Sequence, residues 1–196
     1  MLKKTRILTI IIILCVGMCS GCTSSPGTDS KKPDTPVKET TAQGLSEKDT
    51  RPIMQLGQPV TVTDFCEFTL DKVEFTTEVI PSRPADFYTY YQVKQNDRIY
   101  LHIIARVKNL QPDGQIADTF ADVEAKYDNK YQYTGFCSIE ESGGGDLTYS
   151  NITNIDPLTT AVMHYIIEVP KEVETSGKTL ELTVSINGEE YLYKVR

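Results

Sequence analysis

The sequence predicts an all-β protein built as a two-sheet sandwich, and three observations support this fold class. From residue 56 onward, short runs rich in Val, Ile, Thr, Tyr and Phe alternate with clusters of Gly, Pro, Asn and Asp. No convincing long helical pattern interrupts them. The runs number about seven or eight, which is the strand count expected of a β-sandwich of immunoglobulin type.

Two long strands are expected at residues 98–109 and 160–169, because apolar side chains occupy every second position in both. The inward-facing positions of these two strands are Leu101, Ile103, Ala105, Val107, Met163, Tyr165, Ile167 and Val169. Pro170 ends the second strand, since proline cannot donate a hydrogen bond to a neighbouring strand. Earlier strands are expected at residues 58–63 and 66–75, with a β-bulge where the alternation slips between Leu70 and Val73.

A closing hairpin is the clearest local feature of the sequence. The pair Asn187-Gly188 lies between two alternating runs and suits the positive φ angles of a two-residue type I′ turn. That turn sets the register, which predicts four cross-strand pairs: Ile186 with Glu189, Val184 with Tyr191, Leu182 with Tyr193, and Leu180 with Val195. A second hairpin is expected around Asp128-Asn129, between strands at residues 121–127 and 130–137.

The first 21 residues have the layout of a secretory signal peptide, with a basic start, an apolar run and small residues before Cys22. The sequence from Cys19 to Cys22 resembles the lipobox of bacterial lipoproteins, and the resemblance implies cleavage before Cys22 and acylation of its thiol. Cys19 stands where the family usually has Leu, so cleavage by ordinary signal peptidase is the alternative. The apolar run is shorter than the roughly 20 residues of a membrane-spanning helix, which disfavours a retained transmembrane anchor.

Three segments are therefore expected: a signal peptide at residues 1–21, a tether at residues 22–55 and a folded domain at residues 56–196. The tether begins at the acylated Cys22 and is rich in Ser, Thr, Pro, Lys and Asp, a composition that favours disorder. The chain has a net charge of −7, and removal of the signal peptide with its three basic residues brings this to −10. This charge lies on the folded part and excludes nucleic acid as the main partner.

A resemblance to a known family rests on four features of the folded part. These are the strand from Tyr100 to Asn109, the acidic turn before Tyr131, Pro157 ahead of a strand that ends at residues 168–171, and the closing hairpin. Together they resemble the immunoglobulin-like lipoprotein domain of unknown function found in many Gram-positive bacteria. The resemblance covers residues 56–196 and implies a cell-envelope protein, but it transfers no catalytic residue.

Candidate chemical groups are few. The sequence has none of the short motifs of metalloproteases, α/β-hydrolases, P-loop proteins or CxxC redox proteins. We therefore predict no catalytic residue, cofactor or metal site. His102 and His164 are expected on the outer surface of strands in different sheets. Acidic residues that could gather around calcium lack the spacing of a calcium loop and are expected to be solvated: Asp118, Asp122, Glu124, Glu140, Glu141 and Asp146.

Two cysteines remain after the signal peptide and Cys22 are set aside. Cys66 and Cys137 both fall on inward positions of expected strands, so they form either a disulfide across the core or two buried thiols. Free thiols are the favoured alternative, although the sequence alone does not give the spacing that a disulfide requires.

A tyrosine-rich insertion at residues 77–97 is the main departure from the family pattern. Phe87, Tyr88, Tyr90 and Tyr91 crowd into five positions and are candidate binding residues, because exposed aromatic rings supply much of the contact energy at interfaces. The alternative is that these residues cap one end of the sandwich.

These observations predict a noncatalytic binding or accessory module, held through lipid on Cys22 at the extracytoplasmic face of the cell membrane. Its expected partner is an envelope protein or a glycan. The alternative function is a carrier of a metal or small ligand at the cell surface.

Overall fold

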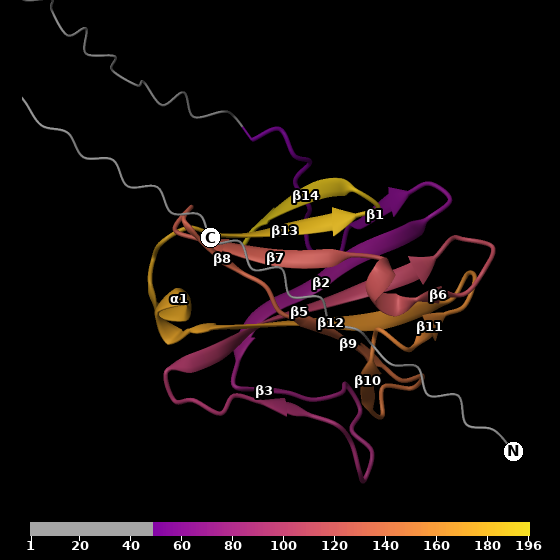
Figure 1. Ribbon diagram of the computed structural model, residues 1–196, viewed down its shortest axis with the longest axis horizontal. Helices are drawn as coiled ribbons and strands as arrows, with labels where there is room; N and C mark the ends of the chain where they lie inside the picture. The colour runs from indigo at the N-terminus through magenta and orange to yellow at the C-terminus, as the bar shows by residue number, and fades with distance from the viewer. Residues whose placement is uncertain (1–48) are drawn as a thin grey trace, which may run out of the picture. The chain divides into compact units, whose positions relative to one another are not determined.

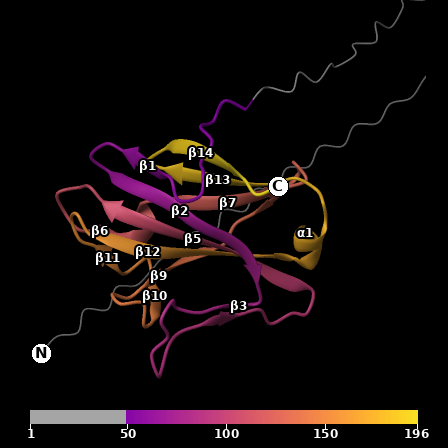
Figure 2. The same ribbon diagram turned by 180° about the vertical axis from the view of Figure 1, so that it is seen from behind.

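A six-stranded and a four-stranded antiparallel sheet face each other in the computed structural model, which describes residues 49–196 (Figures 1 and 2). This arrangement confirms the predicted β-sandwich. The expected signal peptide, Cys22 and most of the expected tether lie outside the described residues. Residues 51–54, at the end of the expected tether, run along strand β14, where the Met54 amide donates to the Leu192 carbonyl over 2.8 Å.

The order of strands in the larger sheet is β1 (Pro59–Val62), β2 (Cys66–Thr76), β5 (Arg98–Asn109), β12 (Thr160–Pro170), β9 (Phe136–Glu140) and β10 (Leu147–Tyr149). The order in the smaller sheet is β14 (Glu189–Lys194), β13 (Leu180–Ile186), β7 (Asp122–Tyr127) and β8 (Tyr131–Tyr133). Short pieces complete the fold: ribbons of β3 (Glu78–Val79) with β4 (Tyr91–Gln92) and of β6 (Gln115–Ile116) with β11 (Asn154–Ile155), the 3₁₀ helix η1 (Ala117–Thr119) and helix α1 (Lys171–Thr175). The two main sheets thus hold more strands than the seven or eight expected.

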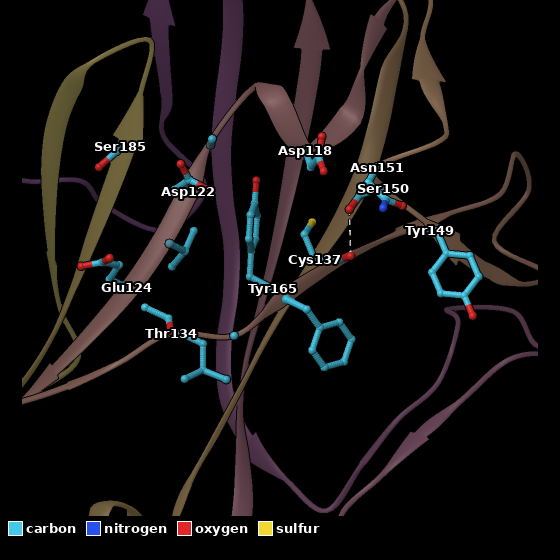
Figure 3. A pocket seen from close by; sticks show the side chains of 15 residues that line it. Asp118, Asp122, Glu124, Thr134, Cys137, Tyr149, Ser150, Asn151, Tyr165 and Ser185 are labelled. Atoms are coloured by element: carbon cyan, nitrogen blue, oxygen red, sulfur yellow. Dashed lines mark hydrogen bonds between the residues drawn. The ribbon is translucent and has the colours of Figure 1, made fainter. Parts of the chain in front are cut away.

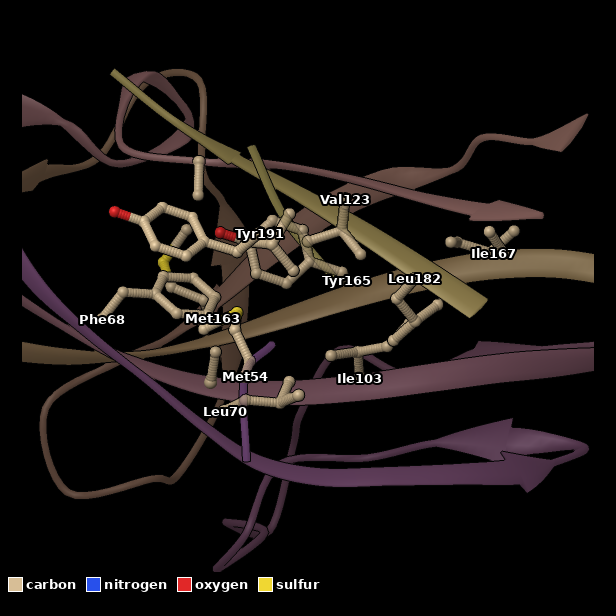
Figure 4. Close-up of a cluster of buried hydrophobic side chains, with 14 of the residues drawn as sticks. Met54, Phe68, Leu70, Ile103, Val123, Met163, Tyr165, Ile167, Leu182 and Tyr191 are labelled. Carbon is tan, nitrogen blue, oxygen red and sulfur yellow. The ribbon is translucent and has the colours of Figure 1, made fainter. Parts of the chain in front are cut away.

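The core lies between the two sheets, as Figure 4 shows. Every predicted inward residue of β5 and β12 is buried there, because the alternation of the sequence follows the pleat of each strand. The smaller sheet contributes the matching layer, with Leu180, Leu182, Val184 and Ile186 fully buried on β13. Burial of such side chains contributes about 1.5–3 kcal/mol each.

The closing hairpin has the predicted turn and register. Asn187 and Gly188 have φ angles of 49° and 83°, and Ile186 lies opposite Glu189. The expected bulge is also present, since the register between β2 and β5 shifts between Leu70 and Lys72. Both features could be predicted because each depends on neighbouring residues along the chain.

The single strand expected at residues 130–137 is wrong, because the chain changes sheets within it. Residues up to Tyr133 pair with β7 in the smaller sheet, and residues from Phe136 onward pair with β12 in the larger one. Gly135 lies at the crossing, where its backbone touches β12: a Cβ added there would overlap the carbonyl oxygen of Ile166. Only glycine fits this close approach.

Substitution Gly135→Ala should therefore destabilise the domain by about 3 kcal/mol, because the β12 backbone must move to admit a methyl group. Chemical denaturation measures the change. Gly177→Ala is the matched control, since no atom lies within 4 Å of the added Cβ there and its φ is not positive. Equal stability of the two variants would contradict the role assigned to Gly135.

Candidate functional site

An open pocket lies between the two sheets, at the side where β7 of the smaller sheet faces β9 and β12 of the larger one (Figure 3). Its volume of about 800 Å³ is sufficient for a small molecule or a partner's side chain. The crossing at Gly135 forms one wall, because the chain leaves the smaller sheet there and joins the larger one.

The pocket has an acidic lining. Asp118 comes from η1, and Asp122 and Glu124 come from β7. No basic side chain is among the residues that line it. We expected these carboxylates to be merely solvated, whereas the fold gathers three of them around one pocket. This arrangement favours a positively charged group.

Tyr165 is a core residue of β12 that also contributes to the pocket. Figure 3 shows its ring between Asp122 and Cys137, with the hydroxyl pointing toward the end of the pocket where Asp118 and Asp122 lie. The residue is only 4% exposed. Its hydroxyl has no hydrogen-bond partner among the described residues, and an unpaired buried hydroxyl costs free energy.

The local environment keeps Tyr165 and Cys137 uncharged. Burial raises the pKa of the Cys137 thiol to about 12, and it raises the pKa of the Tyr165 hydroxyl well above its usual value. The nearby carboxylates of Asp118 and Asp122 add to both shifts. Neither side chain is therefore prepared to act as a nucleophile at neutral pH.

Cys66 and Cys137 are both free thiols among the described residues, but only Cys66 is buried, whereas Cys137 is half-buried. Cys66 is buried on β2, and burial raises the pKa of its thiol to about 12. Cys137 lies on β9 in the pocket wall. The Ser150 hydroxyl donates to the backbone carbonyl of Cys137 over 2.8 Å and fixes the neighbouring loop against β9.

The four candidate binding aromatics do not form one cluster. Phe87, Tyr88 and Tyr90 are exposed, and Phe87 retains 93% of its surface. Tyr91 is half-buried instead: its ring packs edge-on against Phe136, with ring centres 4.9 Å apart, and its hydroxyl donates to Ser138. Because Phe136 belongs to the pocket lining, Tyr91 connects the insertion to the edge of the pocket.

The insertion covers the outer face of the larger sheet and is held there by hydrogen bonds. Val79 of the insertion packs with Tyr100, Leu147 and Ile166 in a second apolar cluster. Three residues after Val79, the Ser82 amide and hydroxyl donate to the Glu140 carboxylate over 2.6 and 2.9 Å. The insertion therefore buries sheet positions that the sequence alone left exposed.

The two histidines were expected on the outer surface and in different sheets, and both expectations are wrong. His102 on β5 and His164 on β12 lie in neighbouring strands of the same sheet, where they are diagonal neighbours. Both are buried, because the insertion packs over the face of the sheet that carries them. Their rings are nearly parallel, with an interplanar angle of 18°, and Nε2 of His102 lies 2.9 Å from Nδ1 of His164.

A carboxylate lies at each end of the histidine pair. Glu74 Oε1 is 3.3 Å from Nδ1 of His102, and Glu140 Oε1 is 3.2 Å from Nε2 of His164. Three contacts follow one another in this row: Glu74 with His102, His102 with His164, and His164 with Glu140. Two neutral rings carry only two N–H protons, so one of the three contacts has an acceptor atom on both sides and no proton between them. The contact between Glu140 Oε1 and Nε2 of His164 lacks the geometry of a hydrogen bond, although the two atoms are only 3.2 Å apart.

This histidine pair predicts a stability loss on mild acidification. Burial lowers the pKa of His102 from 6.5 to about 4 and also lowers that of His164. The unfolded chain therefore takes up protons first as the pH falls below 6.5. We expect the free energy of unfolding to fall by about 2 kcal/mol between pH 7 and pH 5 from His102 alone.

Denaturant titrations at pH 7, 6 and 5 test this expectation. The double variant His102→Gln with His164→Gln should show a flatter pH dependence over the same range, because glutamine does not titrate. A wild-type chain whose stability is constant or rises toward pH 5 would contradict the effect assigned to the pair.

The described residues offer neither a metal centre nor a membrane-spanning helix. Among residues 49–196, no group of three or more His, Cys, Asp or Glu side chains is arranged to hold a metal ion. No helix in that part of the chain is long and apolar enough to cross a bilayer.

The fold and the pocket together define a β-sandwich protein with an acidic pocket between its sheets. The chain is similar to an uncharacterized β-sandwich protein from Clostridium difficile 630, with 31% sequence identity and a TM-score of 0.70 over 76% of this chain and 97% of that one. At this identity and coverage, the chain belongs to the same family as that protein.

A second solved structure shares the fold alone. It is a conserved hypothetical protein from Bacillus anthracis, 12% identical, with a TM-score of 0.50 over 73% of this chain and 95% of that one. No family model and no curated protein matches the chain.

Proposed function

We propose that this protein is a lipid-anchored, extracytoplasmic binding module that engages a partner protein at the cell envelope and catalyses no reaction. The observation that carries the binding role is the pocket between the sheets. It combines room for a side chain with an acidic lining and a buried Tyr165 hydroxyl that the described residues leave without a hydrogen bond. Groups of this kind in a concave, partly apolar site are typical of ligand recognition.

The surface around the pocket supports a protein as the partner. Tyr149 on the pocket lining is exposed, and the insertion nearby carries the exposed rings of Phe87, Tyr88 and Tyr90. Aromatic side chains of this type are enriched among the residues that dominate the energy of protein interfaces. Tyr91 and Phe136 join the two regions through their ring contact, so one partner can contact both.

The groups in the pocket favour binding over catalysis. A nucleophilic mechanism needs a group that loses its proton near neutral pH beside a base. The pKa of Cys137 is raised to about 12, and that of Tyr165 lies well above its usual value. The histidines lie on the opposite face of the larger sheet, under the insertion.

The anchor has its own test. Substitution Cys22→Ser removes the thiol that would carry the lipid, so we expect the variant protein to leave the membrane fraction of a cell lysate. The wild-type chain should stay in that fraction and should show the mass of an acylated amino-terminal cysteine. An unmodified wild-type amino terminus would contradict lipid anchoring.

Photo-crosslinking in intact cells tests the binding role. A photoreactive amino acid at position 149 should capture one discrete protein, identified by mass spectrometry. The double variant Asp118→Asn with Asp122→Asn should reduce the adduct strongly. Leu158 is the control position, because it is 71% exposed against 66% for Tyr149 and does not line the pocket.

Two results would overturn the proposal. One is the absence of an adduct at position 149, and the other is the same set of adducts at position 158. A glycan adduct in place of a protein would overturn the choice of partner.

A further inference from the structure

We infer that the pocket between β7 and β12 binds a protonated primary amine on an aliphatic stem, the chemistry of a lysine side chain. This inference rests on the proposed binding function and names the chemical group that the pocket selects. It is carried by the charge of the lining, by the unpaired hydroxyl of Tyr165 and by the apolar walls beside them.

The charge of the pocket selects a cation. Three carboxylates and no basic side chain line it. Asp118 and Asp122 also act electrostatically on the buried groups beneath, because both contribute to the raised pKa of Tyr165 and of Cys137. An anionic ligand would be repelled, whereas a cation restores charge balance.

The acceptors match an ammonium group. Its three N–H donors have no acceptor among them, and the pocket offers the carboxylates of Asp118 and Asp122 together with the oxygen of Tyr165. Figure 3 shows the Tyr165 hydroxyl directed toward the end of the pocket where these two carboxylates lie. A bound ammonium would therefore supply the hydrogen bond that the hydroxyl does not obtain from the described residues.

The remaining walls suit an aliphatic stem. Ala121, Val123 and Ile167 line the same pocket and are buried apolar residues. A chain of methylene groups can lie against them while its charged end reaches the carboxylates, as lysine stems do on apolar surfaces elsewhere in proteins. A small inorganic cation would leave these walls without contact.

The amine can come from a lysine on a partner protein or from a free diamine, and the open pocket, which the exposed rings of Phe136 and Tyr149 line, favours the lysine. Calorimetric titration of the full-length chain in detergent separates the two sources. The probes are lysine blocked at its α-amino and carboxyl groups, the same compound acetylated on Nζ, and 1,5-diaminopentane.

We expect blocked lysine to bind saturably and the acetylated compound to bind at least tenfold more weakly, because acetylation removes the charge. Asp122→Asn and Tyr165→Phe should each weaken the binding of blocked lysine severalfold. Tyr165→Phe should leave the melting temperature unchanged or higher, because it removes an unpaired buried hydroxyl. Glu168→Gln is the matched control, since this exposed carboxylate lies on β12 outside the pocket, and its Kd should equal that of the wild type.

Equal binding of the acetylated and free lysine compounds, or no saturable binding of either amine, would overturn the inference. Binding of the diamine alone would overturn the lysine side chain as the source. The crosslinking experiment separates failure of this inference from failure of the proposed function. An adduct at position 149 without amine binding would overturn only the inference. Amine binding without an adduct would overturn only the proposed protein partner.

Discussion

The antiparallel pairing of β5 with β12 organises both faces of the larger sheet. Eleven residue pairs join these strands, from Lys108 with Thr160 to Arg98 with Pro170. One face of the pair supplies the centre of the core, and the other holds the two histidines. Tyr165 extends from the same strand pair into the pocket. Because backbone hydrogen bonds along this pair fix the positions of all these side chains, the core, the buried histidines and the pocket floor depend on one register.

The pocket and the histidine pair lie on opposite faces of that sheet. They differ in where their carboxylates lie relative to the buried groups. In the pocket, carboxylates stay on the rim and the buried groups remain neutral. Under the insertion, the carboxylates of Glu74 and Glu140 flank two buried rings, and Lys72 balances one of them from 2.7 Å. The first arrangement is open to a ligand, whereas the second is closed by the chain's own insertion.

Features that depend on adjacent residues could be predicted from the sequence, and features that depend on distant strands could not. The Asn187-Gly188 turn, the bulge after Leu70 and the inward residues of the long strands follow from local alternation and turn chemistry. The histidines were misplaced because alternation gives the face of a strand but not its neighbour. The pocket was missed for a similar reason: Asp118 and Asp122 were recognised as acidic and Tyr165 as inward, yet only the sheet crossing at Gly135 brings them together.

Glu140 connects the insertion to the histidine pair through a single carboxylate. One of its oxygens accepts the Ser82 amide and also faces His164, while the other accepts the Ser82 hydroxyl. Detachment of the insertion would therefore expose both histidine rings to water. It would also remove both hydrogen bonds that Ser82 donates to the Glu140 carboxylate. In thermodynamic terms, detachment of the insertion and proton uptake by the two histidines are linked equilibria. Each of these two processes therefore favours the other. The insertion thus excludes water from the two histidines.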